Sequence, residues 1–229
     1  MANEIISYME MCQREGVSLQ RGMNYEVGKN HSVILMSVRV NAPYADRFDD
    51  DGFTIIYEGH DVSRSPQYPE PKILDQPEFT PLGNLTENGK FHKAAKDYKQ
   101  NLRPPERVRV YEKIKSGIWS YNGVFHLIDS WQEQANGRRV FKFKLSAVEG
   151  DEDFSMPVIE DSKVRRIIPT NVKLEVWKRD GGKCSICGAT KNLHFDHIIP
   201  WSKGGSSNTA DNIQLLCGKH NLEKHNKIE

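Results

Sequence analysis

The chain has 229 residues and a nearly balanced charge, with 32 Lys and Arg against 31 Asp and Glu. This length suffices for one large or two modest domains. No apolar run approaches the ~20 residues of a membrane span, and the amino terminus lacks a basic stretch followed by an apolar one, so we expect neither a membrane partner nor secretion. Three of the four cysteines lie in the last quarter and Cys12 stands alone, which favours a reducing, cytoplasmic compartment over a disulfide framework.

The predicted elements begin with a short helix over residues 3–15, where apolar residues recur at roughly helical spacing. A β-rich region follows, interrupted by a second helix over 88–101 with lysines on one face and apolar residues on the other. Strands are expected where apolar and polar residues alternate, at 31–40, 53–57, 107–115, 123–131 and 139–148. This part should therefore be a curved sheet or barrel with flanking helices.

The sequence turns acidic after Glu149, which is typical of a linker. A short helix over 171–180 then opens a new unit, and Gly181-Gly182 ends it. Another helix is expected beyond Cys217. We therefore predict an α+β protein with three parts: an amino-terminal domain over 1–150, a linker over 151–168 and a carboxy-terminal domain over 169–229.

Basic residues are concentrated in one stretch. Lys90 to Lys115 holds nine Lys and Arg against three Asp and Glu, a local excess of six positive charges. Such an excess suits a phosphate backbone. A solvated helix face followed by an amphipathic strand explains the same charges equally well.

Two pairs of metal ligands frame the last domain. Cys184 and Cys187 are separated by two residues, and so are Cys217 and His220. Four such donors are typical of a tetrahedral structural Zn²⁺ site. A domain of some 60 residues also gains from an ion that closes a long loop. We predict that these four residues bind zinc.

A second set of polar residues lies between and just beyond the zinc ligands: Asp196, His197, Asn212 and Asn221. Hydrolysis of a phosphodiester needs a base that titrates near neutrality, and the ordinary pKa of His is about 6.5. It also needs a cation at the reacting phosphate, and Asp with an amide oxygen suits a hard ion such as Mg²⁺ or Mn²⁺.

The motifs WKRDGGKC-x-x-CG, FDHIIPWSKGG and DNIQLLC-x-x-HN-x-x-K resemble the HNH endonucleases of the zinc-containing ββα-metal type. The resemblance covers residues 171–227. It implies that His197 is the general base, that Asp196 holds a divalent ion, and that Asn212 holds the loop and the histidine in place.

The third position of the HNH motif is Asn221, so the chain resembles the H-N-N variant, in which this side chain is expected to ligate the metal. His220 is another candidate for this role, but its use would leave zinc with three protein ligands. His225 is a further candidate, better explained as a phosphate contact or a surface residue.

Residues 22–148 resemble the SRA domain, a PUA-like curved β-barrel that reads modified cytosine by flipping the base. The similar segments are HSVILMSV, PYADRFDDDGFTIIYEGHD and RVRVYEKIKSGIWSYNGVFHLIDSW. The sequence departs from the family's Tyr-Asp-Gly at Tyr121-Asn122-Gly123.

The resemblance implies a pocket for the flipped base. Tyr44 and Tyr57 would sandwich the base, which offsets the stacking lost from the duplex. Asp46 and Asp49 both lie in the loop that should bind the cytosine amino group, and the sequence does not choose between them. In the competing interpretation Tyr57 is an ordinary core aromatic and the acidic loop is solvated.

The combined resemblance predicts a modification-dependent endonuclease that reads 5-methyl- or 5-hydroxymethylcytosine in double-stranded DNA, in the cytoplasm of a bacterial-type cell. A nicking or homing-type HNH enzyme and a non-catalytic zinc-stabilised DNA-binding module are the alternatives. One active site cuts one strand, so a homodimer on DNA is expected. Six residues are candidates for contacts to the DNA backbone: Lys90, Lys93, Arg103, Arg165, Arg166 and Lys224.

Overall fold

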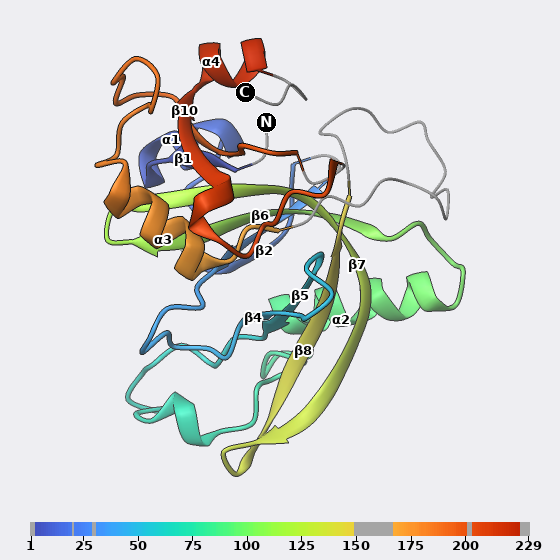
Figure 1. Ribbon diagram of the computed structural model, residues 1–229. Coiled ribbons are helices and arrows are strands. Elements are labelled where there is room, and N and C mark those ends of the chain that lie inside the picture. Colours follow the sequence, from blue (N-terminus) through green and yellow to red (C-terminus); the bar gives the residue numbers. More distant parts are fainter. Residues whose placement is uncertain (1–2, 20, 29–30, 149–166, 201–202, 225–229) are drawn as a thin grey trace.

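The computed structural model describes residues 3–19, 21–28, 31–148, 167–200 and 203–224. Most of the expected linker, Arg165, Arg166 and His225 lie outside these residues. Within the described part, strands and helices occur as separate elements rather than as alternating βαβ units (Figure 1). The predicted α+β class is confirmed.

The described strands form one ten-stranded sheet. Its main path runs β10-β9-β1-β7-β6-β3-β2, and β8, β5 and β4 continue from β7. Only the pairing of β3 with β6 is parallel among the pairs described. The strands are β1 Glu4–Ile6, β2 Met23–Gly28, β3 His31–Met36, β4 Arg47–Phe48, β5 Thr54–Glu58, β6 Glu106–Lys115, β7 Ile118–Ala135, β8 Arg138–Ala147, β9 Leu193–His197 and β10 Ile213–Cys217.

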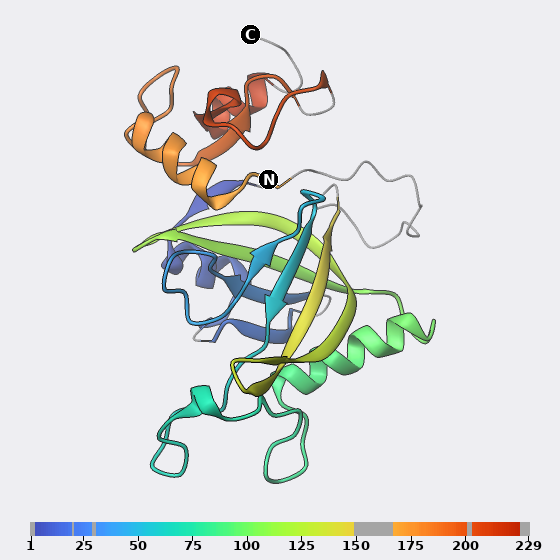
Figure 2. The same cartoon turned by 60° about the horizontal axis from the view of Figure 1, so that its bottom comes forward.

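The length of β7 explains the curvature of the sheet. Its 18 residues pair with β1 and β6 in the first half and with β8 in the second. Register shifts between Val110 and Tyr111 and between Leu127 and Asp129 mark β-bulges, which bend a strand and increase its twist. The two long strands β7 and β8 therefore curve around the molecule (Figure 2).

Four α-helices are described: α1 Tyr8–Glu15, α2 Glu87–Lys99, α3 Thr170–Arg179 and α4 Gly218–Lys224. Short 3-10 turns occur at Pro71–Ile73 and Ala210–Asn212. The two helices predicted at 88–101 and 171–180 are confirmed within two residues at each end, and α4 confirms the helix expected beyond Cys217.

The helix predicted over 3–15 is wrong at its start. Residues 4–6 form β1, and the helix begins at Tyr8 after Ser7, which caps it in a capping box with Glu10. Glu4 has a strand neighbour on each side, Tyr121 in β7 and His194 in β9. Pairing on both sides outweighs the helical spacing of a three-residue segment.

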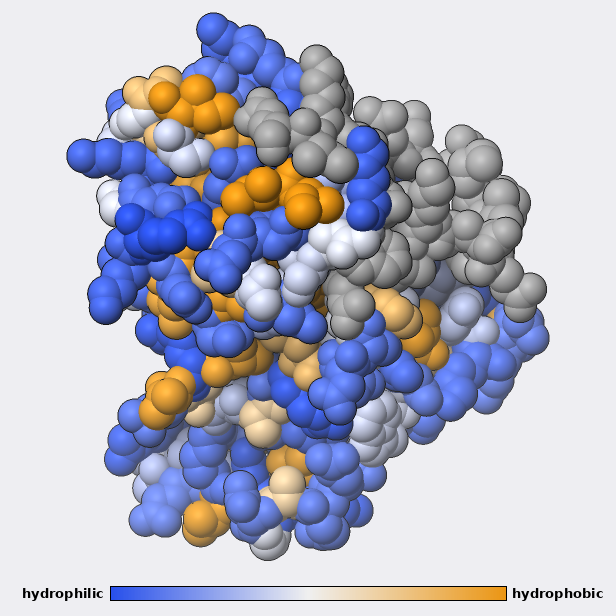
Figure 3. All heavy atoms as spheres, viewed as in Figure 1, coloured by the Kyte–Doolittle hydropathy of each residue, from blue (hydrophilic) through white to orange (hydrophobic). Residues whose placement is uncertain are grey.

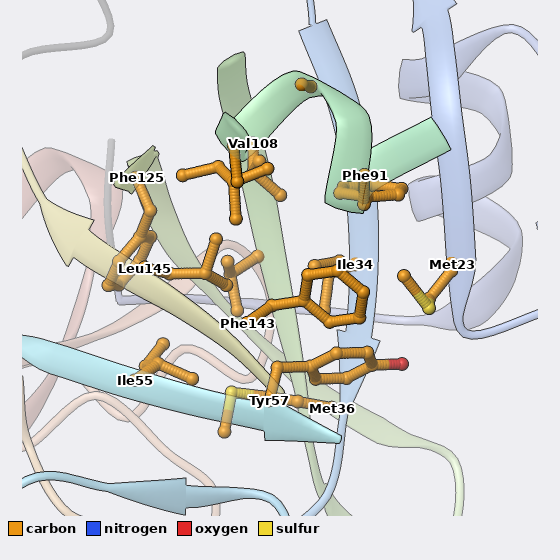
Figure 4. Close-up of a cluster of buried hydrophobic side chains, with 14 of the residues drawn as sticks. Met23, Ile34, Met36, Ile55, Tyr57, Phe91, Val108, Phe125, Phe143 and Leu145 are labelled. Carbon is orange, nitrogen blue, oxygen red and sulfur yellow. The ribbon is translucent and has the colours of Figure 1, made fainter. Parts of the chain in front are cut away.

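The main core lies between the curved sheet and α2. Tyr57, Phe91 and Phe143 are fully buried there, together with aliphatic side chains of β3, β6 and β8 (Figure 4). A separate apolar cluster joins α3 to β9 and β10 and includes Val176 and Phe195. The face seen in Figure 3 is largely hydrophilic, with apolar side chains in small groups.

Candidate functional site

The predicted zinc ligands converge. The donor atoms of Cys184, Cys187, Cys217 and His220 all lie within 4.8 Å of one another. The Sγ atoms of Cys187 and Cys217 are 3.8 Å apart, and His220 Nδ1 is 3.3 Å from Cys217 Sγ. Two thiolates about 2.3 Å from a tetrahedral ion would lie about 3.8 Å apart. The four side chains therefore fit a zinc ion by geometry as well as by chemistry.

Local backbone geometry prepares Cys184 for a metal. Burial raises the pKa of its thiol, but backbone N–H groups of Cys187, Cys217 and Ile186 outweigh this and lower that pKa to about 6. A thiol with such a pKa is largely thiolate at neutral pH, and the thiolate is the metal-binding form. The two-residue spacing thus supplies both ligands and backbone amides that stabilise the negative charge on Cys184.

The strands β9 and β10 and the helix α4 form the frame that carries the second residue set. Asp196 and His197 end β9, and α4 packs against both strands. The imidazole of His197 has its Nε2 atom 2.8 Å from Ser207 Oγ. Sequence reasoning missed Ser207, because ten residues and an irregular loop separate it from His197.

Asn212 braces the loop that follows His197. Its Oδ1 atom accepts a hydrogen bond from Ile199 N at 2.8 Å, and its Nδ2 atom donates to Ile199 O at 3.0 Å and Ser206 O at 2.9 Å. A Cβ at Gly205 would lie 1.8 Å from Ile199 O and 2.7 Å from Asn212 Nδ2. Asn212 and Gly205 therefore hold the backbone of Ile199 close to that of Ser206.

Asp196 has a lysine as its ionic partner. Lys224 Nζ is 2.8 Å from Asp196 Oδ2 and donates to the carbonyl oxygen of His197. Burial raises the pKa of Asp196, and Lys224 opposes this effect. The expectation that Lys224 contacts the DNA backbone needs correction, because its side chain is only 1% exposed and lies inside the α4–β9 packing.

His220 and Asn221 are adjacent in α4. His220 is committed to the cysteine cluster, with Nδ1 3.5 Å from Cys184 Sγ. This placement favours Asn221 over His220 as the third residue of the motif.

At the expected base pocket, the aromatic ring that stacks on Tyr44 is not that of Tyr57. The ring that stacks on Tyr44 belongs to His60, with centroids 4.8 Å apart and planes at 12°. Tyr57 is buried in the main core, and its hydroxyl lies 2.8 Å from His60 Nε2. Tyr44 and His60 line a cavity of about 840 Å³ between the loops that precede β2 and α2. Sequence reasoning missed His60, although it lies three residues after Tyr57.

The two candidate aspartates, Asp46 and Asp49, lie in different surroundings. The carboxylate of Asp46 accepts hydrogen bonds from Ser37 N at 3.0 Å and Glu58 N at 3.1 Å, and burial raises its pKa to about 7. Asp49 lies in the turn between β4 and β5, where its carboxylate accepts from Asp50 N. Asp46 is thus the aspartate that lies beside Tyr57.

Three of the expected backbone contacts carry ion pairs. Lys90 pairs with Glu87 at 2.6 Å, and Lys93 pairs with Asp97 at 2.5 Å. Arg103 pairs with Glu106 and donates to the hydroxyl of Tyr25. Part of the local excess of positive charge is therefore offset by near neighbours.

Comparison with known proteins matches both parts of the chain. A family model described as HNH endonuclease matches residues 184–227. SUVH9 of Arabidopsis thaliana, described as a histone-lysine N-methyltransferase family member, is 26% identical over 160 residues. This match covers 67% of the chain but only 23% of SUVH9, so the chain spans about a quarter of the length of that relative.

Two solved structures show similar folds. The SUVH5 SRA domain in complex with hemi-methylated CG DNA is 25% identical, with a TM-score of 0.44, and the match covers 68% of this chain and 93% of that one. The sulfur-binding and SRA domains of ScoMcrA, complexed with phosphorothioated DNA, are 19% identical, with a TM-score of 0.44 and coverage of 69% and 43%. The HNH endonuclease model thus matches the carboxy-terminal segment, while SUVH9 and the two solved structures each match about two thirds of the chain.

Proposed function

We propose that this protein is a DNA endonuclease that cuts in response to a modified cytosine. The observation that carries the nuclease half is the arrangement at the end of β9, where Asp196 and His197 stand beside a loop braced by Asn212. The cysteine cluster holds β10 and α4 beside this strand end. These are the residue types that phosphodiester hydrolysis requires.

In the proposed mechanism, His197 removes a proton from the attacking water. Its Nε2 atom lies 2.8 Å from Ser207 Oγ, and this contact orients the imidazole ring. Asp196 and Asn221 would hold a divalent ion such as Mg²⁺ or Mn²⁺, which stabilises the charge that develops on the leaving oxygen. Asn212 keeps the loop in place, and Lys224 favours the charged form of the buried Asp196.

Recognition of the base is proposed for the amino-terminal part. Its support is the sequence resemblance at residues 22–148 together with the cavity beside Tyr44 and His60. Stacking on an aromatic ring offsets the cost of extruding a base. A buried, hydrogen-bonded carboxylate at Asp46 is suited to fix the orientation of a polar base edge.

A nicking or homing-type nuclease, indifferent to modification, is the second candidate. It is favoured by the burial of Tyr57 in the main core, where its ring lies tilted at 44° to the ring of His60 and does not line the cavity. In either case one HNH segment supplies one active site. Cleavage of both strands is therefore proposed to use two copies of the chain, acting on DNA in the cytoplasm.

The deciding experiment compares plasmids that carry cytosine, 5-methylcytosine or 5-hydroxymethylcytosine, each incubated with the protein and Mg²⁺ or Mn²⁺. We expect cleavage of a modified plasmid only. Equal cleavage of all three plasmids would favour the second candidate. The matched control is His197→Ala, which should retain its zinc and its affinity for modified DNA and lose at least about 100-fold in rate, within the range of a general base. Undiminished cleavage by this variant rules out the proposed mechanism.

A further inference from the structure

The amino-terminal strand belongs to both parts of the molecule. Asn3 N donates to Tyr121 O of β7 at 2.6 Å, and Phe195 N of β9 donates to Asn3 O at 3.0 Å. Glu4 pairs with Tyr121 on one side and His194 on the other. Figure 2 shows this strand between the carboxy-terminal part and the amino-terminal part, which is proposed to recognise the base and is called the recognition part below. The strand that ends in Asp196 and His197 is therefore hydrogen-bonded, through β1, to the sheet of the recognition part.

A buried ion pair makes a second connection. Lys173 on α3 places Nζ 2.7 Å from Glu112 Oε2 on β6 and 2.7 Å from Asn122 Oδ1 on β7. Both charged side chains are 0% exposed. Asn122 donates to Glu112 at 3.0 Å, and Thr170 contacts the same carboxylate. Removal of the Lys173 charge alone would leave the carboxylate of Glu112 buried without its ionic partner, which is strongly unfavourable.

Apolar contacts close the same interface. Ile5 of β1 packs against the α3–β9–β10 cluster and against the cluster beside the cysteines. The ammonium of Lys115, at the end of β6, lies 5.5 Å from the ring centroid of Trp177 on α3. The interface thus combines backbone pairing, a buried ion pair and apolar packing. The side chains that build it are neither the proposed catalytic residues nor those that line the cavity beside Tyr44.

We propose that β1 and Lys173 fix the nuclease segment to the recognition part as one rigid unit, and so set the cut at a constant number of nucleotides from the recognised base. The inference rests on the proposed function. A catalytic domain held only by a flexible tether samples a range of positions along the DNA, set by the tether's length. A domain held by a shared sheet and a buried ion pair samples a single position along the DNA. In this view β1 and Lys173 are positioning elements that touch no DNA.

The first test maps the cut on an end-labelled duplex that contains a single modified cytosine. We expect wild-type protein to cut each strand at one main position. Lys173→Met should spread the cuts over neighbouring positions and reduce the share at the main position at least about 3-fold. The matched control is Lys99→Met, which breaks the exposed ion pair with Asp129 and should keep the wild-type pattern.

The second test does not depend on cleavage. Hydrogen exchange at the amides of β1 should be slow in wild-type protein and at least about 10-fold faster in Lys173→Met, with unchanged exchange in β3 and β8. If Lys173→Met alone does not fold, the double variant Glu112→Gln/Lys173→Met removes both charges at nearly constant volume and serves instead. A wild-type enzyme that cuts over a wide range would overturn the inference. So would a variant with unchanged cut positions and unchanged exchange.

Discussion

At the residue scale, two titratable groups beside Tyr57, Asp46 and His60, have pKa values shifted in opposite directions by the same cause. Burial raises the pKa of Asp46 to about 7 and lowers the pKa of His60 to about 4. Burial disfavours whichever form carries the charge. Around Asp46, Glu58 raises this pKa further, while Lys142 and the backbone N–H groups of Ser37 and Glu58 oppose the rise.

These shifts predict opposite effects on stability as the pH changes. A raised pKa means that Asp46 binds its proton more tightly in the folded state than in the unfolded state. Its contribution to the free energy of unfolding is therefore present below about pH 4 and is lost as the pH rises to about 7. A lowered pKa at His60 means the reverse, because its contribution is present above about pH 6.5 and is lost as the pH falls to about 4.

Asp46→Asn isolates the first effect. The substitution costs a hydrogen bond to the ionised form, since an amide has one acceptor oxygen where the carboxylate uses two. The difference in unfolding free energy between variant and wild type should nevertheless shift in favour of the variant from pH 4 to pH 7. Denaturant unfolding at several pH values measures it. A difference that is constant over this range contradicts the shifted pKa of Asp46.

Residue roles were predictable where they depend on short spacing. The four residues predicted to bind zinc were grouped because two-residue spacing decides which donors can share an ion, and their donor atoms converge. His60, Ser207 and Lys224 were not assigned their partners, because each partner lies in another loop or element. Glu112 and Lys173, 61 residues apart, carry no sequence signal of their pairing.

At the element scale, the loop from Ile198 to Ser207 depends on a glycine that has no room for a side chain. At Gly205 a Cβ would meet the carbonyl oxygen of Ile199 at 1.8 Å, so the backbone of one of the two must move. Its neighbour Gly204 has a positive φ of 89°, but a Cβ there would meet no atom within 4 Å. The two glycines thus serve different purposes, close approach at one and a left-handed backbone at the other.

Gly205→Ala is therefore expected to displace the loop and with it Ser207, the partner of His197. The cleavage rate should fall at least about 10-fold, the effect of a misplaced catalytic group. Zinc content and DNA affinity should stay near wild type, because the zinc ligands and the base cavity lie in other segments. A Gly205→Ala enzyme as fast as wild type would show that the loop tolerates the shift.

Gly204→Ala is the matched control for this prediction. It places the same methyl group in the same loop, strains the backbone through its positive φ, and meets open space. Its cleavage rate should therefore stay within about 3-fold of wild type. A loss as large as that of Gly205→Ala would assign the effect to backbone strain in the loop rather than to the collision with Ile199.

Element prediction succeeded where a single periodicity runs through a whole element. The strands at 107–115 and 139–148 and the helix at 88–101 are confirmed nearly to the residue. The strand predicted at 123–131 is only the middle of β7, which extends over the Gly- and Asn-containing segments on both sides because β6 and β8 pair with them. The prediction for the start of the chain failed because the three residues of β1 are too few to show a strand periodicity.

At the scale of the whole molecule, the two parts have separate cores. The main core lies in the amino-terminal part, whereas the carboxy-terminal part has smaller clusters around α3 and beside the cysteines. A small unit with little buried apolar surface depends on its metal for folding. Loss of zinc should therefore affect the two parts unequally, although the sheet is continuous through β1.

Cys184→Ser tests this asymmetry. The buried Cys184 joins β10 to α4 through the cluster, so its loss should abolish zinc binding, unfold the carboxy-terminal part and eliminate cleavage. Affinity for modified DNA should stay within about 3-fold of wild type, because none of the described residues of that part belongs to the main core. Metal analysis, thermal unfolding and a binding assay measure the three effects. Cys12→Ser, which removes the cysteine outside the cluster, should change none of them. If Cys184→Ser loses both zinc and DNA binding, recognition and cleavage share one folding unit, and the interface built by β1 and Lys173 is needed for the recognition part to fold.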